Sequence, residues 1–83
     1  MDATDWAKDG ETLRRTVEAR DFPTAIAIVV AVADAAEAMN HHPDIDIRWR
    51  TLHFALTTHD KGGLTDKDYT LAAKIDDIVK ANA

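Results

Sequence analysis

Three of the four histidines in this 83-residue chain lie in two short segments that also carry carboxylates. His41 and His42 stand together in Glu37-Ala-Met-Asn-His-His-Pro-Asp, and His59 follows eighteen residues after His41 in Thr-Thr-His-Asp. Imidazole and carboxylate groups donate and accept protons near neutral pH. Because the chain contains no cysteine, thiol chemistry is excluded. An enzyme built from these residues is expected to catalyse proton transfer.

These histidines also have structural explanations. Imidazoles at a helix end can bond its last carbonyl groups and interact favourably with its dipole, so His41 or His42 alone would be read as a cap. Two histidines before a proline, with a third predicted nearby, favour a site. A zinc site is disfavoured because H-E-x-x-H and cysteine pairs are missing and adjacent histidine side chains diverge. We therefore expect no metal.

Three carboxylates are candidates for binding a substrate or orienting the histidines. Glu37 lies one helical turn before His41 and could orient an imidazole and raise its basicity, although Glu is most often a solvated surface residue. Asp60 precedes two glycines, which either let the backbone approach a ligand closely or simply form a turn. Asp68 lies on an apolar stripe, but with Thr65 it also matches a variant capping box, which would occupy its oxygens with backbone N–H groups.

Glu37 belongs to a predicted helix from Phe22 to about Met39. Asp21 is its expected N-cap, Pro23 lies in the first turn, and Pro43 prevents the helix from continuing. One stripe of this helix can cover a sheet, and a second needs another partner. We therefore expect a homodimer or homotetramer formed through this helix. The two apolar stripes consist of Phe22, Ile26, Val29, Ala33 and Ala36, and of Ile28, Val32, Ala35 and Met39.

Residues 44–57 alternate between apolar and polar side chains in two runs, which predicts a β-hairpin. A two-residue turn at Arg50-Thr51 would place Trp49 in the core opposite Leu52, and the solvated His53 opposite Arg48. The pairs Ile47–Phe54 and Ile45–Leu56 follow from the same register. Continued further, it places His42 opposite His59, so the two histidine segments should meet at one end of the hairpin.

The remaining elements complete an α+β fold. Residues 5–8 and 11–19 are predicted strands around the turn Asp9-Gly10, and a helix from the Thr65 cap runs to about Lys80. The order strand, strand, helix, strand, strand, helix predicts a four-stranded antiparallel sheet with helices on one face. The inward stripe of the last helix contains Leu71, Ala72, Ile75 and Ile78.

Composition predicts one small domain over residues 1–83 with a core near the lower limit for independent stability. Hydrophobic residues make up 46% and charged residues 30%, which fits a soluble folded domain. A net charge of −5 disfavours direct nucleic-acid binding. The start lacks the pattern of a signal peptide, and the longest apolar run, residues 25–33, is too short to span a bilayer. We therefore expect a cytoplasmic protein that needs no membrane.

The two histidine segments together resemble a known family. Glu37-x-x-x-His-His-Pro, followed by Leu56-Thr-Thr-His-Asp-x-Gly-Gly-Leu-Thr-x-x-Asp68, is similar to pterin-4a-carbinolamine dehydratase, also called 4a-hydroxytetrahydrobiopterin dehydratase. The resemblance covers roughly residues 11–80. It implies dehydration of 4a-hydroxytetrahydropterin to quinonoid dihydropterin without a metal or cofactor, in tetrahydropterin recycling. The implied active-site residues are His41, His42 and His59, with Glu37 and Asp68 beside them.

The chain departs from the pattern of that family in two places. Many relatives carry an aromatic residue where this chain has Ile45, and the family begins with an additional helix for which this chain has no room.

The family also has roles other than catalysis. The known members form dimers or tetramers. Since animal relatives are transcription-factor dimerisation cofactors and other relatives assist Rubisco assembly, the alternative is a non-catalytic interaction protein or assembly chaperone on the same fold. A pterin binder without turnover is a third possibility.

Overall fold

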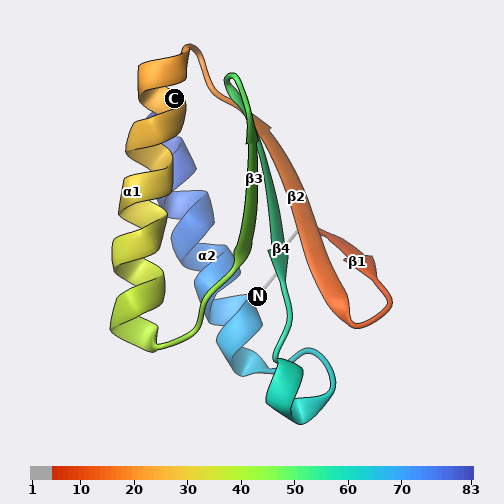
Figure 1. Cartoon of the computed structure of the whole chain (residues 1–83). Helices are drawn as coiled ribbons and strands as arrows, with labels where there is room; N and C mark the ends of the chain where they lie inside the picture. Colours follow the sequence, from red (N-terminus) through yellow and green to blue (C-terminus); the bar gives the residue numbers. More distant parts are fainter. Residues whose placement is uncertain (1–4) are drawn as a thin grey trace.

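The computed structural model describes residues 5–83 as four strands and two long helices (Figure 1). The expected order of elements is confirmed, while residues 1–4 of the expected domain lie outside the described part. The sheet is antiparallel with the strand order β1-β2-β4-β3. The elements are β1 (Ala7–Asp9), β2 (Thr12–Glu18), α1 (Phe22–Met39), β3 (Asp44–Arg48), β4 (Thr51–Leu56), the short 3-10 helix η1 (His59–Lys61) and α2 (Asp66–Ala81).

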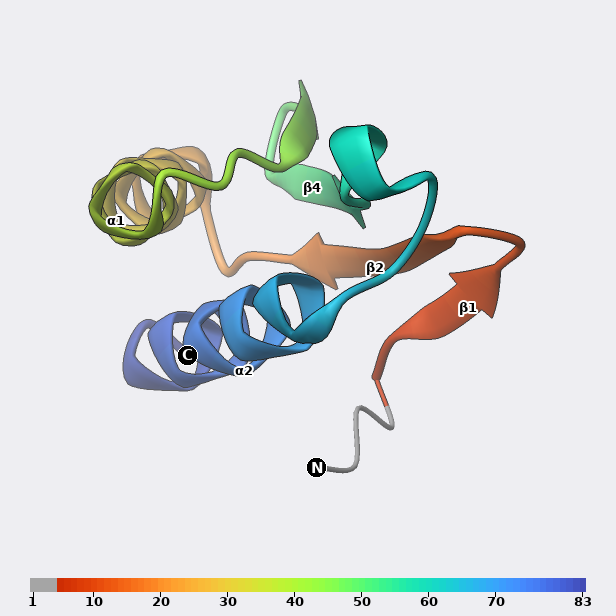
Figure 2. The ribbon, with the colours of Figure 1, turned by 90° about the horizontal axis from the view of Figure 1, so that it is seen from below.

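Both long helices cover the same face of the sheet, as Figures 1 and 2 show, which confirms the predicted α+β fold. The core lies between the central strands β2 and β4 and the two helices. Burial of each large apolar side chain there contributes about 1.5–3 kcal/mol, enough to hold the ends of the elements in place. The most completely buried apolar side chains are Phe54, Ile28, Leu52, Leu56, Leu71, Ile75 and Val32.

Helix α1 has the predicted limits and the predicted N-cap. The Thr24 N–H donates to the Asp21 carboxylate at 2.8 Å, and Asn40 ends the helix in the left-handed region with φ 51°. Its core stripe is the one centred on Ile28 and Val32, with Ala25 and Ala36 also buried. Of the other predicted stripe, Phe22, Ile26 and Ala33 are exposed, Val29 is half-buried, and Ala36 lies in the core.

The apolar character of α1 also bears on the membrane question. Its 18 residues have a mean hydropathy of 1.6, so by length and composition α1 is long and apolar enough to cross a membrane. The continuous apolar run of residues 25–33 did not indicate this. A core helix of a globular domain meets the same criterion, and the Ile28 stripe of α1 packs in the core here.

The register predicted for the β3–β4 hairpin is wrong by two residues. Ile47 pairs with Leu52 and Ile45 with Phe54, so the turn is formed by Trp49 and Arg50. A shift of two residues keeps every side chain on its face, which is why alternation alone could not detect it. Trp49, predicted in the core, is 72% exposed at the turn, and the Arg50 guanidinium lies over its ring.

The predicted turn of the first hairpin is wrong by one residue. Asp9 pairs with Thr12, which leaves Gly10 and Glu11 in the turn, and Gly10 supplies the positive φ of 60° that this turn requires. Arg15 does share the inward face of β2, as its spacing indicated. Its charge is neutralised there by Asp76 of α2, which also accepts a hydrogen bond from the indole of Trp6 at 2.8 Å.

Candidate active site

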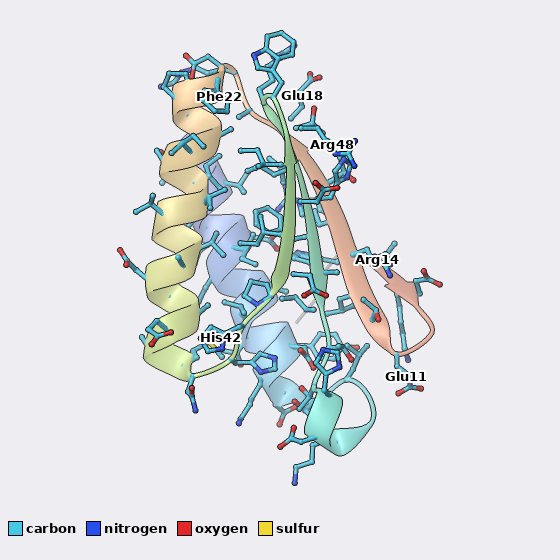
Figure 3. The ribbon with its side chains drawn as sticks, in the orientation of Figure 1. Glu11, Arg14, Glu18, Phe22, His42 and Arg48 are labelled. Carbon is cyan, nitrogen blue, oxygen red and sulfur yellow. The ribbon has the colours of Figure 1, made fainter. Side chains whose placement is uncertain are left out.

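A pocket of about 330 Å³ forms where the segment after α1 meets the segment after β4. In Figure 1 both segments lie at the same end of the molecule, and Figure 3 shows His42 at that end. The predicted meeting of the two histidine segments is confirmed. The proposed ladder contact between His42 and His59 is wrong, because pairing of β3 with β4 stops at Asp44 and Ala55. The pocket is lined by Asn40, His41, His42, Thr57, Thr58, His59 and Asp60.

His41 is the most constrained histidine of the pocket. It is 9% exposed, and its Nε2 lies 2.6 Å from Oδ1 of Asp68, which is completely buried. The second oxygen of Asp68 accepts hydrogen bonds from the Thr58 hydroxyl at 2.7 Å and from the Thr65 N–H at 2.9 Å. Asp68 therefore caps α2 with one oxygen and contacts His41 with the other. Asp68 is not itself among the residues that line the pocket.

Two opposing effects set the pKa of Asp68. Burial acts to raise the pKa of this carboxyl group, because a charge loses its hydration in the interior. Hydrogen bonds from Thr58, His41 and the Thr65 N–H act in the other direction, and their combined effect leaves the pKa of Asp68 below its ordinary value. At neutral pH the residue is an anion that accepts hydrogen bonds with both oxygens.

His42 has a different partner in a wetter environment. Its Nε2 lies 2.8 Å from Oε1 of Glu37, and the side chains of His42 and Glu37 are 60% and 79% exposed. Glu37 was expected to orient an imidazole, and the imidazole that it contacts is that of His42, because the chain turns at Asn40 after the last residue of α1 and brings His42 back towards Glu37. A carboxylate this exposed is screened by solvent and salt, so it holds its imidazole less firmly than Asp68 does.

His59 and Asp60 reach the pocket from η1, the turn that leaves β4. Thr58 and Gly63 close this turn with two backbone hydrogen bonds of 3.2 and 3.3 Å, and Gly62 ends it with a φ of 69°. A Cβ at Gly63 would lie 1.8 Å from the terminal oxygen Oε2 of the exposed Glu11, a flexible side chain that would have to move aside. The turn that carries the exposed His59 and Asp60 is therefore held by these backbone hydrogen bonds and by the left-handed Gly62.

The fourth histidine lies outside the pocket. His53 is exposed on the uncovered face of the sheet, opposite Asp46 rather than Arg48, and its Nδ1 lies 3.0 Å from the hydroxyl of Thr16. Within residues 5–83, no group of three or more His, Cys, Asp or Glu side chains could hold a metal ion.

Three pocket residues were missed by the sequence reading: Asn40, Thr57 and Thr58. Asn40 stands between the last turn of α1 and the double histidine, where a left-handed helix end is common. The pair Thr57-Thr58 immediately before His59 was a usable signal, because a strand places consecutive side chains on opposite faces. Thr58 consequently faces inward, towards Asp68, while the hydroxyl of Thr57 donates to the carbonyl oxygen of Glu11 at 2.7 Å.

These features define a class of protein: an α+β domain with an acid–base pocket built from three imidazoles, two of them paired with carboxylates. Such a pocket can remove a proton from one atom of a small molecule and deliver a proton to another. Comparison with known proteins gives the family. The sequence profile described as pterin 4 alpha carbinolamine dehydratase matches residues 1–78, and the chain belongs to this family.

Curated relatives with the provisional name of a pterin-4-alpha-carbinolamine dehydratase support this assignment. A protein of Nocardia farcinica is 54% identical over 80 residues, covering 96% of this chain and 84% of the relative. A protein of Roseiflexus castenholzii is 56% identical over 78 residues, covering 94% and 84%. The chain therefore matches most of the length of these relatives.

Two solved structures have the same fold. The transcriptional coactivator/pterin dehydratase from Brucella melitensis superimposes with a TM-score of 0.88 at 29% identity, covering 92% of this chain and 83% of that one. A pterin dehydratase-like protein described as a RuBisCO assembly factor in the alpha-carboxysome gives a TM-score of 0.77 at 19% identity, covering 90% and 89%. At that lower identity the likeness establishes the fold alone.

Proposed function

We propose that this protein is a 4a-hydroxytetrahydropterin dehydratase, which converts the 4a-carbinolamine to quinonoid dihydropterin and water in tetrahydropterin recycling. The observation that carries the proposal is the pocket itself. His41, His42 and His59 line one cavity, and separate carboxylates pair with the first two. The family of the chain and the names of its relatives support the same substrate class.

The proposed reaction requires only two proton movements. A base removes the proton from N5 of the pterin while an acid protonates the hydroxyl group on C4a, which leaves as water as the N5–C4a double bond forms. Imidazoles suit both tasks because their protonation changes near neutral pH. The chemistry needs no metal and no organic cofactor, and Asp60 together with backbone groups of the pocket can bind the polar edge of the pterin.

Single substitutions of the three pocket histidines test this function. The rate of quinonoid dihydropterin formation from freshly generated carbinolamine is measured for His41→Ala, His42→Ala and His59→Ala. A positioned acid or base contributes about 10²–10⁴-fold, so a large loss is expected for the imidazoles that transfer protons. His53→Ala is the matched control, since this histidine lies on the uncovered sheet face, and it should retain the wild-type rate. Wild-type rates in all three pocket variants would contradict the proposal.

The alternative is a non-catalytic assembly role on the same fold. The solved structure described as a RuBisCO assembly factor shows that this fold occurs in proteins with such a description. A protein that only assembles others needs no convergent histidines, whereas this chain brings His41, His42 and His59 to one pocket. Catalysis is therefore the function that the site favours, and a wild-type protein without turnover would favour the alternative.

We further propose that the protein self-associates through α1, as a homodimer or homotetramer in the cytoplasm. Phe22, Ile26 and Val30 of α1 are 47%, 39% and 56% exposed, and Figure 3 shows Phe22 at the start of this helix. Ile47 and Trp49 of the neighbouring hairpin are exposed as well. Several exposed large apolar side chains on a small domain are typical of a protein interface, and a second copy would cover them symmetrically.

A further inference from the structure

Thr58 occupies a position that the proposed chemistry has not used. It is 5% exposed, and its hydroxyl lies 2.7 Å from Oδ2 of Asp68 and 2.8 Å from the hydroxyl of Thr65. Its backbone closes the turn that begins with His59, through both hydrogen bonds to Gly63. Thr58 therefore contacts the carboxylate behind His41 with its side chain and supports His59 with its backbone.

The direction of each hydrogen bond around Asp68 follows from the chemistry of the groups. An ionised carboxylate only accepts hydrogen bonds, so Thr58 donates its single hydroxyl proton to Oδ2. Thr65 must then donate its own hydroxyl proton to the oxygen of Thr58. On the other side of the carboxylate, Nε2 of His41 must be the donor to Oδ1. The neutral imidazole of His41 consequently carries its proton on Nε2.

This tautomer leaves Nδ1 as the nitrogen of His41 that can accept a proton. Among residues 5–83, no buried side-chain nitrogen or oxygen lacks a hydrogen-bond partner, and the ring of His41 bonds through Nε2. Nδ1 therefore meets solvent, and His41 is one of the residues that line the pocket. The groups that bond Asp68 therefore determine which nitrogen of His41 can react.

We propose that Thr58 is a positioning residue: its hydroxyl fixes the orientation of Asp68, which keeps the proton of His41 on Nε2 and presents Nδ1 to the substrate. The expected effect on turnover rests on the dehydratase function proposed above, whereas the tautomer of His41 does not. Without this hydroxyl, Oδ2 of Asp68 retains only the Thr65 N–H as a donor. The carboxylate can then rotate within its buried site, and His41 can change its tautomer.

The test compares Thr58→Val, which removes the hydroxyl and keeps the shape, with Thr58→Ser, which restores a hydroxyl. Thr16→Val is the matched control, because Thr16 also contacts a histidine from a strand but on the uncovered face. ¹⁵N NMR of the imidazoles, at a pH where they are neutral, reports which ring nitrogen carries the proton. His41→Gln identifies the signals of His41. These measurements need neither substrate nor turnover.

We expect His41 to be a single Nε2–H tautomer in the wild type, in Thr58→Ser and in Thr16→Val, and a mixture of tautomers in Thr58→Val. Turnover of Thr58→Val should fall about 10–100-fold in kcat, as for other residues that orient a reacting group, with KM changed less than about twofold. Thr58→Ser should recover most of that loss. If Thr58→Val does not fold, Thr58→Ala carries the same expectations.

Each contrary result of these measurements refutes a specific part of the proposal. A wild-type His41 protonated on Nδ1 would refute the tautomer whatever the variants do. An unchanged His41 spectrum in Thr58→Val would refute the positioning role, even if activity falls. A changed spectrum with wild-type kcat would refute its catalytic importance. If the wild-type protein has no dehydratase activity, the proposed function fails, while the NMR measurement still decides whether Thr58 controls the proton of His41.

Discussion

His41 and Asp68 are separated by 27 residues in the sequence, and their side chains share a hydrogen bond of 2.6 Å between Nε2 and Oδ1. One residue follows the end of α1 and the other lies in the first turn of α2. The packing of both helices on one face of the sheet brings them together (Figure 2). The contact between His41 and Asp68 therefore depends on the helix packing. Because the carboxylate of Asp68 has no access to water, it restricts the orientation of His41.

Asp68→Asn is expected to lower turnover about 10–100-fold, by analogy with the loss of carboxylates that orient metal-binding histidines. An amide keeps the shape, but its N–H group can donate a hydrogen bond to the imidazole and thereby favour the wrong tautomer. The rate of quinonoid dihydropterin formation measures the effect. Asp66→Asn, which changes an exposed carboxyl group in the same helical turn, is the control. A variant with more than half of the wild-type rate would contradict this role of Asp68.

Glu37→Gln is expected to have a much smaller effect, about threefold or less in turnover. The Glu37–His42 pair is exposed on both sides, and exposed ion pairs contribute roughly 0–1 kcal/mol because water and salt screen them. The ratio of wild-type to variant rates should approach one as the salt concentration rises. If Glu37→Gln were as damaging as Asp68→Asn, the distinction between the buried and the exposed carboxylate would be wrong.

Asp68 should also make folding stability depend on acid pH. Hydrogen bonds from Thr58, His41 and Thr65 outweigh burial and hold the pKa of Asp68 below its ordinary value. A carboxyl group with a lower pKa in the folded state contributes stability that is present above its unfolded-state pKa, about 3.9. This contribution is lost as pH falls through the folded-state pKa. Urea unfolding at several pH values between about 7 and 2 measures the free energy of unfolding.

The wild type should therefore lose its stability advantage over Asp68→Asn as pH falls below about 4. Other carboxyl groups with a lowered pKa, such as the N-cap Asp21, are present in both proteins and cancel in the difference. A constant difference in the free energy of unfolding across this pH range would show that the carboxylate of Asp68 has no such linkage.

Substitution on the exposed stripe of α1 tests self-association. Val30→Glu introduces a charge on the apolar surface that Val30 forms with Phe22 and Ile26, and burial of an unpaired charge is costly. Sedimentation velocity should show an assembled wild-type protein and a monomeric variant. Thr70→Glu, an equivalent change on the exposed surface of α2, should remain assembled. A wild-type protein that stays monomeric at about 100 µM would contradict the interface, since stable interfaces of standard size usually bind more tightly.

Most of the fold followed from local patterns, because each has a direct physical cause. Asp21 and Pro23 predicted the start of α1, since a cap satisfies N–H groups that proline does not need. The meeting of the two histidine segments followed from the antiparallel hairpin, whose strands must end together. The partners within the site were not predictable in the same way. Glu37 bonds His42 instead of His41, and this depends on the left-handed turn at Asn40, which spacing along a helix does not contain.

The hairpin register shows the limit of pattern reasoning most directly. Trp49 has a φ of 56°, a left-handed conformation that costs roughly 1–2 kcal/mol for a residue with a Cβ. Turn preference does not distinguish a turn at Arg50-Thr51 from one at Trp49-Arg50, because neither pair contains the Asn or Gly that such turns prefer. In the structure Leu52 of β4 pairs with Ile47 of β3 on one side and with Val17 of β2 on the other, and the alternation within the hairpin contains no information about this second neighbour.

Trp49→Asn should consequently stabilise the protein by about 0.5–1 kcal/mol, because Asn adopts the left-handed region more readily than Trp. The indole is 72% exposed, so its removal costs little within one subunit, apart from the contact with Arg50 at 5.2 Å. Thermal unfolding at low protein concentration measures the gain, and Trp49→Phe, which keeps an aromatic ring in the same strained turn, should not show it. Destabilisation by Trp49→Asn that grows with protein concentration would show that Trp49 contributes to the proposed subunit interface, whereas destabilisation at low concentration would contradict the predicted gain.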